Sequence, residues 1–297
     1  MAKDAWGGSW TEHKLNIFEK YVNAYLTIMN QHRDKHNWKL IYFDAFAGSG
    51  TRKAIQEEEQ DLESLFGITN EDIAVYKGAA ERVVNIMQRG FDFYYFIEND
   101  EEARKELEEK LTSLNPAKKL NFQFRSEDAN EQLERMADAM KTDKALYSLA
   151  LLDPFGMQVN WTSIEKLSGT NTDLWILIPS GVIINRLLDK YGKLTHIDRL
   201  VSHFGLSEDE IKKCFYEENP EYSLFGTGDV QYQKIDKPIR KITKIYIQQL
   251  QGIFCEVTEI PLALYNSKNV PIYHFAFASN NKVAKKIASQ IIAKIEK

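Results

Sequence analysis

The chain has 297 residues, enough for one decorated α/β domain or about two smaller domains. Hydrophobic residues make up 43% of the chain and aromatic residues 12%, which supports a sizeable core and excludes wholesale disorder. The net charge of −5 excludes a protein that binds polyanions over its whole surface, but it is compatible with a local basic groove.

The cysteines and the apolar stretches narrow the class of protein further. Cys214 and Cys255 lie far apart, and neither has a second thiol or a histidine at ligand spacing. We therefore expect no disulfide framework and no metal site. The start of the chain has no apolar leader, and the most apolar stretch, 174–184, contains Pro179 and Gly181 and is too short to span a bilayer. These features predict a soluble cytoplasmic protein with no membrane contact.

The first quarter of the chain predicts a helix followed by a strand. Apolar residues at three- and four-residue spacing favour an amphipathic helix over 9–33. The apolar run 39–44 predicts a buried strand that ends in Asp44 and enters a glycine turn over 45–50. Residues 51–77 are acidic and lack a regular pattern, which favours an insertion.

From residue 78 onwards, helical and strand patterns alternate. Helices are predicted over 78–90, 100–114, 128–141, 162–167 and from 182 to about 191, and strands over 93–97, 121–125, 146–152 and 173–178. Together with 39–44, these strands predict a doubly wound, mostly parallel Rossmann-like sheet with helices on both faces.

The end of the chain departs from this alternation. Residues 192–229, punctuated by glycine and proline, predict a helical insertion or lid, and a long helix is expected over 231–250. The late strands 253–260 and 272–278 have no helix between them, so they should form an antiparallel hairpin before a final helix. Such a hairpin strand beside a parallel sheet is typical of the class I methyltransferase fold. We expect one domain over 1–297.

Candidate ligand-binding residues follow the first predicted strand. Asp44 is followed by Phe46, Gly48 and Gly50, and glycines in such a turn let backbone amides approach a ligand. The third glycine of the dinucleotide fingerprint is missing, and no P-loop is present. The segment resembles motif I of amino-group methyltransferases, which implies that Asp44 holds the ammonium group of S-adenosyl-L-methionine. A plain tight turn is the alternative.

Acids also end the next two strands. Glu98 closes 93–97, and its two carboxylate oxygens suit the two hydroxyls of a ribose. Asp128 follows the third strand, where the methyltransferase layout places a contact to the adenine amino group. Both acids precede predicted helices, so a role at a helix N-terminus is the alternative for each.

The most specific motif is Asp153-Pro154-Phe155-Gly156, at the end of the fourth strand. It resembles the Asp-Pro-Pro-Tyr/Phe motif of amino-methyltransferases, with Phe155 in place of the second proline, and the corresponding motif of guanine-N2 tRNA methyltransferases. The resemblance implies that Asp153 and the Pro154 carbonyl accept hydrogen bonds from the target amine while Phe155 stacks on the base. An Asp-Pro turn is the alternative.

A run of basic residues stands apart from these strand ends. It comprises Lys234, Lys237, Arg240, Lys241 and Lys244, interrupted only by Asp236. We interpret it as the solvated face of a helix, with a phosphate-contacting stripe as the alternative.

The combination of these segments resembles the three-Cys-motif partner proteins. The resemblance rests on the amphipathic start with Trp10 and Lys14-Leu15, on 42–50 and 96–98, on 128–130, and on 152–156. It implies a bacterial protein with a methyltransferase-like Rossmann fold and a three-Cys-motif protein of the phage Gp37/Gp68 type as partner.

Two hypotheses of function follow. The first is an S-adenosylmethionine-dependent methyltransferase that acts on an amino group of a nucleobase in DNA or RNA. The second is a catalytically silent, methyltransferase-like binding module that works with a three-Cys-motif protein. A nicotinamide oxidoreductase is disfavoured by the missing glycine and the closing hairpin, and a nuclease by the lack of a recognised nuclease spacing.

Overall fold

The computed structural model describes residues 8–48, 78–114, 120–218, 232–265 and 269–295. The predicted insertion 51–77, Gly50 and part of the predicted lid lie outside these residues. Within the described ranges, no helix has the length and apolar character needed to cross a membrane.

The described strands form a large sheet in the order β3-β2-β1-β4-β5-β10-β8, with β9 also paired to β10. The parallel part comprises β1 (Lys39–Asp44), β2 (Phe93–Ile97), β3 (Phe122–Arg125), β4 (Leu146–Leu152) and β5 (Thr172–Ile178). The antiparallel part comprises β8 (Glu256–Val257), β9 (Leu262–Tyr265) and β10 (Pro271–Ser279). This order, with β10 reversed beside β5, is that of the class I methyltransferase fold, as the sequence predicts.

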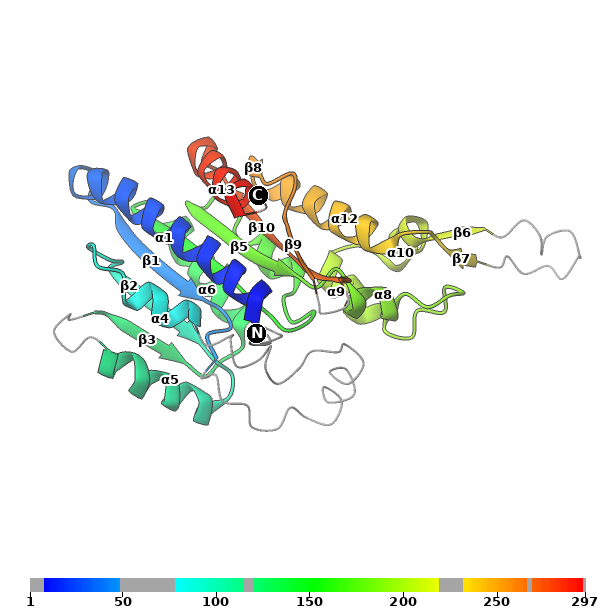
Figure 1. Cartoon of the computed structure of the whole chain (residues 1–297), viewed down its shortest axis with the longest axis horizontal. Helices are drawn as coiled ribbons and strands as arrows, with labels where there is room; N and C mark the ends of the chain where they lie inside the picture. The colour runs from blue at the N-terminus through cyan, green and yellow to red at the C-terminus, as the bar shows by residue number, and fades with distance from the viewer. Residues whose placement is uncertain (1–7, 49–77, 115–119, 219–231, 266–268, 296–297) are drawn as a thin grey trace, which may run out of the picture.

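Helices cover both faces of the sheet (Figure 1). One face packs against α1 (Gly8–His36), α4 (Gly78–Val84), α5 (Glu101–Leu114) and α13 (Lys282–Ile295). The other packs against α6 (Ala129–Thr142), α7 (Trp161–Glu165), α8 (Val182–Leu187), α9 (Ile197–Phe204), α10 (Glu208–Phe215) and α12 (Pro238–Ile253). Alternate side chains of the strands enter the two cores, as the twofold period of a strand requires.

Aromatic packing holds α1 against the sheet. Tyr21 places its ring centroid 5.3 Å from that of Trp175 on β5 and 4.9 Å from that of Phe277 on β10. Phe18 lies one turn earlier and meets Trp175 edge-on. The buried stripe that the sequence predicts for this helix therefore lies over the centre of the sheet.

The end of the chain differs from the sequence prediction in three places. The long helix begins at Pro238 rather than 231, because Lys237 adopts a left-handed conformation and proline favours the first helical turn. A small hairpin of β6 (Tyr216–Glu218) and β7 (Tyr232–Lys234) precedes it. The predicted strand 253–260 is mostly wrong: α12 continues to Ile253, β8 spans two residues, and β9 provides the longer partner of β10.

Two predicted helices are shorter than expected. α4 ends at Val84, before the predicted end at 90, and α8 ends at Leu187 instead of near 191. The remaining predicted helices and parallel strands agree with the structure to within a few residues.

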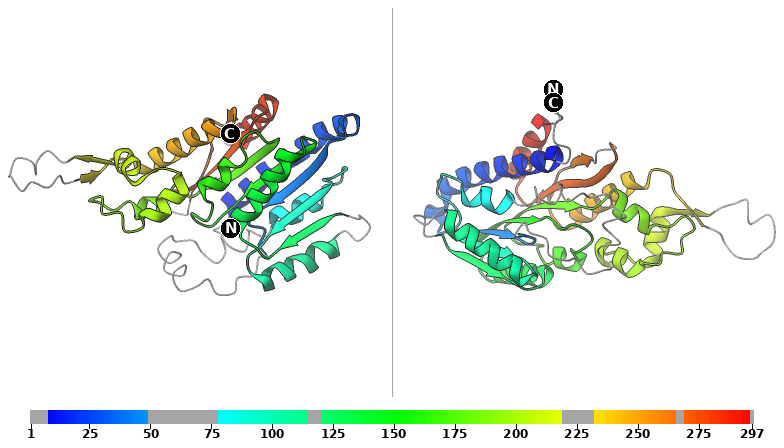
Figure 2. Two further views of the ribbon diagram at one scale, coloured as in Figure 1. Left: turned by 180° about the vertical axis from the view of Figure 1, so that it is seen from behind. Right: turned by 60° about the horizontal axis from the view of Figure 1, so that its bottom comes forward.

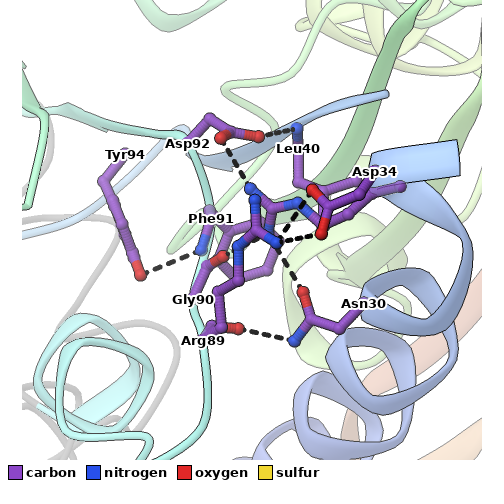
Figure 3. A network of polar contacts seen from close by, with 9 residues as sticks. Asn30, Asp34, Leu40, Arg89, Gly90, Phe91, Asp92 and Tyr94 are labelled. Carbon is purple, nitrogen blue, oxygen red and sulfur yellow. Dashed lines mark hydrogen bonds and ion pairs between the residues drawn. The ribbon is translucent and has the colours of Figure 1, made fainter. Parts of the chain in front are cut away.

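The carboxyl end of α1 is tied to the start of β2 by an ion pair between a buried arginine and a partly exposed aspartate. Arg33, whose side chain is 2% exposed, donates from Nη2 to Asp92 Oδ1 at 2.6 Å and from Nη1 to the Gly90 carbonyl at 2.7 Å. Asp92 also accepts the Leu40 amide at 2.7 Å, so one carboxylate joins α1, β1 and β2 (Figure 3). The network lies at the amino ends of the strands and fixes the position of α1.

We expect the Asp92→Ala variant to lose about 3 kcal/mol of unfolding free energy, because the Arg33 charge then stays buried without its carboxylate. The matched control is Arg89→Ala, whose neighbouring pair with Asp34 is exposed and should contribute no more than about 1 kcal/mol. Urea denaturation followed by circular dichroism measures both. Equal losses in the two variants would contradict the structural role of the Arg33 pair.

Candidate functional site

Asp44 occupies the end of β1 with its carboxylate inside the protein. The residue is 2% exposed, and its Oδ2 accepts the hydroxyl of Tyr42 at 3.0 Å. Its Oδ1 accepts the Phe46 amide at 3.4 Å, which closes the turn after the strand. Among the described residues, these hydrogen-bond partners of Asp44 are both neutral.

A second buried carboxylate, Asp153, ends β4 beside β1 and is paired with a lysine from α1. Lys14 donates from Nζ to Asp153 Oδ2 at 2.5 Å, and the two residues are 1% and 4% exposed. Lys14 reaches this position because α1 runs across the sheet with its amino-terminal half near the carboxyl ends of the strands (Figure 1). The predicted acceptor Asp153 is thus already engaged by an ammonium group.

The two carboxylates differ in electrostatic environment. Burial raises the pKa of Asp44 to about 7, and the negative charge of Asp153 adds to this effect, while Lys14 and the hydrogen bonds oppose it. Lys14 forms its ion pair with Asp153 and not with Asp44. Among the described residues, no cation is bonded directly to Asp44, so this buried carboxylate is suited to a cationic ligand group.

The turn after β1 meets the end of β2 at Gly48 and Glu98. Gly48 has φ of +54°, in the left-handed region that favours glycine. Burial raises the pKa of the Glu98 carboxyl, and hydrogen bonds from the backbone of Asp100, Gly48 and Asn99 oppose the rise. Glu98 Oε1 accepts a hydrogen bond from the Asp100 amide at 2.9 Å. The structure thus places Glu98 beside Gly48 while keeping its side chain only partly buried.

Asp128 is exposed and acts as the N-cap of α6. Its Oδ1 accepts the amides of Asn130 and Glu131 at 2.9 and 3.1 Å. The capping alternative is therefore present in the structure. Capping engages one of the two carboxylate oxygens, so it is compatible with a ligand contact through the other.

The turn after Asp153 is held by side chains from outside the motif. Pro154 is buried, and Phe155 donates its amide to Gln158 Oε1 at 3.1 Å. The Phe155 carbonyl accepts the hydroxyl of Tyr273, on β10, at 2.7 Å. These bonds hold Asp153 and Phe155 at the carboxyl edge of the sheet, where α/β proteins bind ligands.

Sequence reasoning did not assign a role to Lys14 or Tyr273. The signal for Lys14 is its place on the apolar stripe of the first helix, four residues before Phe18 and seven before Tyr21, where a solvated lysine is unexpected. Tyr273 lies in an apolar strand, and its sequence neighbours contain no comparable signal. Within the described ranges, no group of three or more side chains is arranged to hold a metal ion.

Sequence similarity between this chain and known proteins is low. No family model and no curated protein matches the chain. Protein LPL1258 of Legionella pneumophila, described by the family model DUF519, is 15% identical, with a TM-score of 0.41 over 93% of this chain and 98% of that protein. Trm1 of Pyrococcus horikoshii, solved with S-adenosyl-L-methionine, is 10% identical, with a TM-score of 0.41 over 94% of this chain and 58% of Trm1. The strand order alone assigns the fold class.

We expect Lys14→Met to lower the unfolding free energy by about 3–5 kcal/mol, because Asp153 then remains buried without its cation. The double variant Lys14→Met/Asp153→Asn removes both charges and should recover more than half of that loss. Urea denaturation of the wild type and both variants measures the difference. A double variant as unstable as the single one would show that the ion pair does not account for the loss.

Proposed function

We propose that this protein binds S-adenosyl-L-methionine and methylates an exocyclic amino group of a nucleobase in DNA or RNA. The observation that carries the proposal is Asp44, a buried carboxylate with neutral hydrogen-bond partners at the central carboxyl edge of a class I methyltransferase sheet. Asp153 and Glu98 end the two strands on either side of β1.

The residues present suit this cofactor. Asp44 would hold its ammonium group, and the left-handed turn at Gly48 would line the methionine part beside Phe46. Glu98 would accept the ribose hydroxyls, and Asp128 would contact adenine through the carboxylate oxygen that does not cap α6. When bound, the cofactor supplies an electrophilic methyl group. Gly50, also expected in this site, lies outside the described residues.

Asp153 and Pro154 would receive the target amine, and Phe155 would stack on its base. Lys14 orients the Asp153 carboxylate through Oδ2, so the incoming amine has to share that carboxylate with the lysine. Hydrogen bonds from the amine to Asp153 and to the Pro154 carbonyl would aim its lone pair at the methyl group. Catalysis would then rest mainly on positioning.

The Lys14 contact also supports the second hypothesis, a catalytically silent module. An ammonium group already donates to Asp153, which is the interaction expected of a methyl acceptor. In this alternative the scaffold binds a three-Cys-motif protein of the phage Gp37/Gp68 type and transfers no methyl group. The two hypotheses differ in turnover rather than in fold.

The cofactor site predicts a pH-dependent affinity. Asp44 is protonated in the free protein below its pKa of about 7, and the ligand ammonium requires the ionised form. Affinity for S-adenosylhomocysteine should therefore rise with pH between about 5 and 7, by at most about tenfold per pH unit. Asp44→Asn should lose about 1.5–3 kcal/mol of binding free energy at neutral pH and most of the pH dependence.

Isothermal titration calorimetry on the full chain measures the affinity for S-adenosylhomocysteine at each pH. Glu109→Gln, at an exposed position on α5, is the control for net charge. An unchanged affinity in the Asp44 variant would refute its assigned role. Absence of binding to wild type, alone and with the partner protein, would refute the cofactor itself.

Turnover distinguishes the two hypotheses. If the protein is a methyltransferase, wild type should transfer tritiated methyl groups to DNA or RNA. The Lys14→Met/Asp153→Asn variant should then be slower by roughly a hundredfold, with its affinity for S-adenosylhomocysteine nearly unchanged. Stable complex formation with a three-Cys-motif protein, without transfer to DNA, RNA or that protein, would instead support the silent module.

A further inference from the structure

The exposed face of α12 carries a stripe of positive charge. Lys237, at the N-cap, and Arg240, Lys241 and Lys244 are exposed at three- and four-residue spacing, which places them along one side of the helix. The opposite side, including Ile242 and Tyr246, is buried in the core beneath the sheet. We call these four residues the α12 basic stripe.

Within the described residues, the α12 basic stripe forms no ion pair with an acidic residue, whereas some exposed lysines on other helices do. α12 itself contains no aspartate or glutamate, and no ion pair joins a residue of the stripe to another described residue. By contrast, Lys105 pairs with Glu101 within α5, and Lys212 pairs with Glu208 within α10. Repulsion between the like charges of the stripe destabilises α12 slightly, so helix stability does not explain why these cations are there.

The α12 basic stripe belongs to a part of the molecule that extends from the carboxyl edge of the sheet. α8 begins just after the end of β5, and α12 contacts α8, α9 and β10. Figure 2 shows α12, α10, β6 and β7 projecting to one side of the sheet. We call these four projecting elements the arm. The stripe therefore lies on the arm, which leads away from the candidate site.

An exposed aromatic residue lies beside the arm. Tyr191 is 59% exposed, and Lys190 Nζ lies 5.3 Å from the centroid of its ring. The Lys190 carbonyl accepts the amide of Lys234 at 3.2 Å, which ties this loop to the strand that precedes α12. An exposed aromatic ring with adjacent cations is the combination that binds unpaired bases and their phosphates.

In the part of the chain that the structure describes, the exposed acids of the same region, including Glu217 and Glu218 on β6, form no ion pair with the stripe. Asp236 is exposed beside Lys237. The oxygens of Asp189 accept the amides of Tyr191 and Leu194. Glu210 accepts the amide of Ser207 in the capping box at the start of α10. A membrane surface is disfavoured as the partner, because the apolar side of α12 is packed in the core and cannot insert between lipids.

We propose that the α12 basic stripe and Tyr191 bind a single-stranded segment of the nucleic acid substrate. The lysines and Arg240 contact phosphates, and Tyr191 stacks on an unpaired base. This inference rests on the proposed function for its substrate class, and it adds a binding surface outside the residues of the candidate site. The arm would hold the strand while one base enters the site.

The test is direct binding without cofactor. The full chain is titrated into fluorescein-labelled oligothymidylate or oligouridylate of about 20 nucleotides, longer than a site of about 4–16. Fluorescence anisotropy is recorded over a series of salt concentrations. The stripe variant is Arg240→Gln/Lys241→Gln/Lys244→Gln. The control, Lys282→Gln/Lys286→Gln/Lys294→Gln, removes three exposed charges from α13.

We expect the stripe variant to bind about 10- to 100-fold more weakly at low salt and to lower the salt slope by about 2, with little change in the control. Tyr191→Ala should weaken binding without altering the salt slope. Equal weakening by both triple variants, no weakening by either, or no binding by wild type would overturn the proposal. If the protein binds just one of the two oligonucleotides, the result supports the proposal and identifies the strand as DNA or RNA.

Because no cofactor is present, this result is independent of the Asp44 experiment. If wild type binds the cofactor and transfers methyl groups, but the stripe variant binds oligonucleotide as tightly as wild type, the proposed binding surface is refuted. The proposed enzymatic activity is then unaffected. Oligonucleotide binding that depends on the stripe, without methyl transfer to DNA or RNA whose bases carry exocyclic amino groups, would support the surface and refute the enzymatic activity.

Discussion

The buried ion pair between Lys14 and Asp153 is the interaction on which the candidate site depends. Removing two charges from water is costly, so such a pair persists only where geometry and packing hold both groups in place. Here the 2.5 Å contact joins α1 to the end of β4. A second ion pair, between the buried Arg33 and the partly exposed Asp92, anchors the other end of α1, about 28 Å away along a helix of this pitch. The first helix therefore spans the sheet as a fixed part of the site.

This arrangement makes the two central carboxylates chemically different. Asp153 pairs with a cation, whereas Asp44 has no cation bonded to it among the described residues, although they end neighbouring strands and both are buried. Burial, reinforced by the negative charge of Asp153, favours the neutral form of the Asp44 carboxyl and raises its pKa to about 7. The edge of the sheet thus presents one position suited to a cationic group and one already occupied by such a group, and this difference underlies both hypotheses of function.

The two faces of the sheet are covered in different ways. One face is covered by a compact layer of α1, α4, α5 and α13. On the other face α8, α9, α10 and α12 extend beyond the sheet, and α12 carries the basic stripe (Figure 2). The net charge of the whole chain is negative, so the stripe is a local feature and not a general property of the surface. Its location after β5 connects a charged surface to the edge where ligands bind in this class of fold.

The sequence by itself determined the fold class and the strand ends at which Asp44, Glu98 and Asp153 stand, because helical and strand periodicities are local and parallel strands bring their carboxyl ends together. It did not predict β9 or the β6–β7 hairpin, whose short strands have too little pattern to be recognised. Only the tertiary structure paired Lys14 with Asp153 and Tyr273 with Phe155. Those partners lie 139 and 118 residues apart in sequence. The packing of α1 against the sheet and the antiparallel pairing of β10 within it decide which side chains meet.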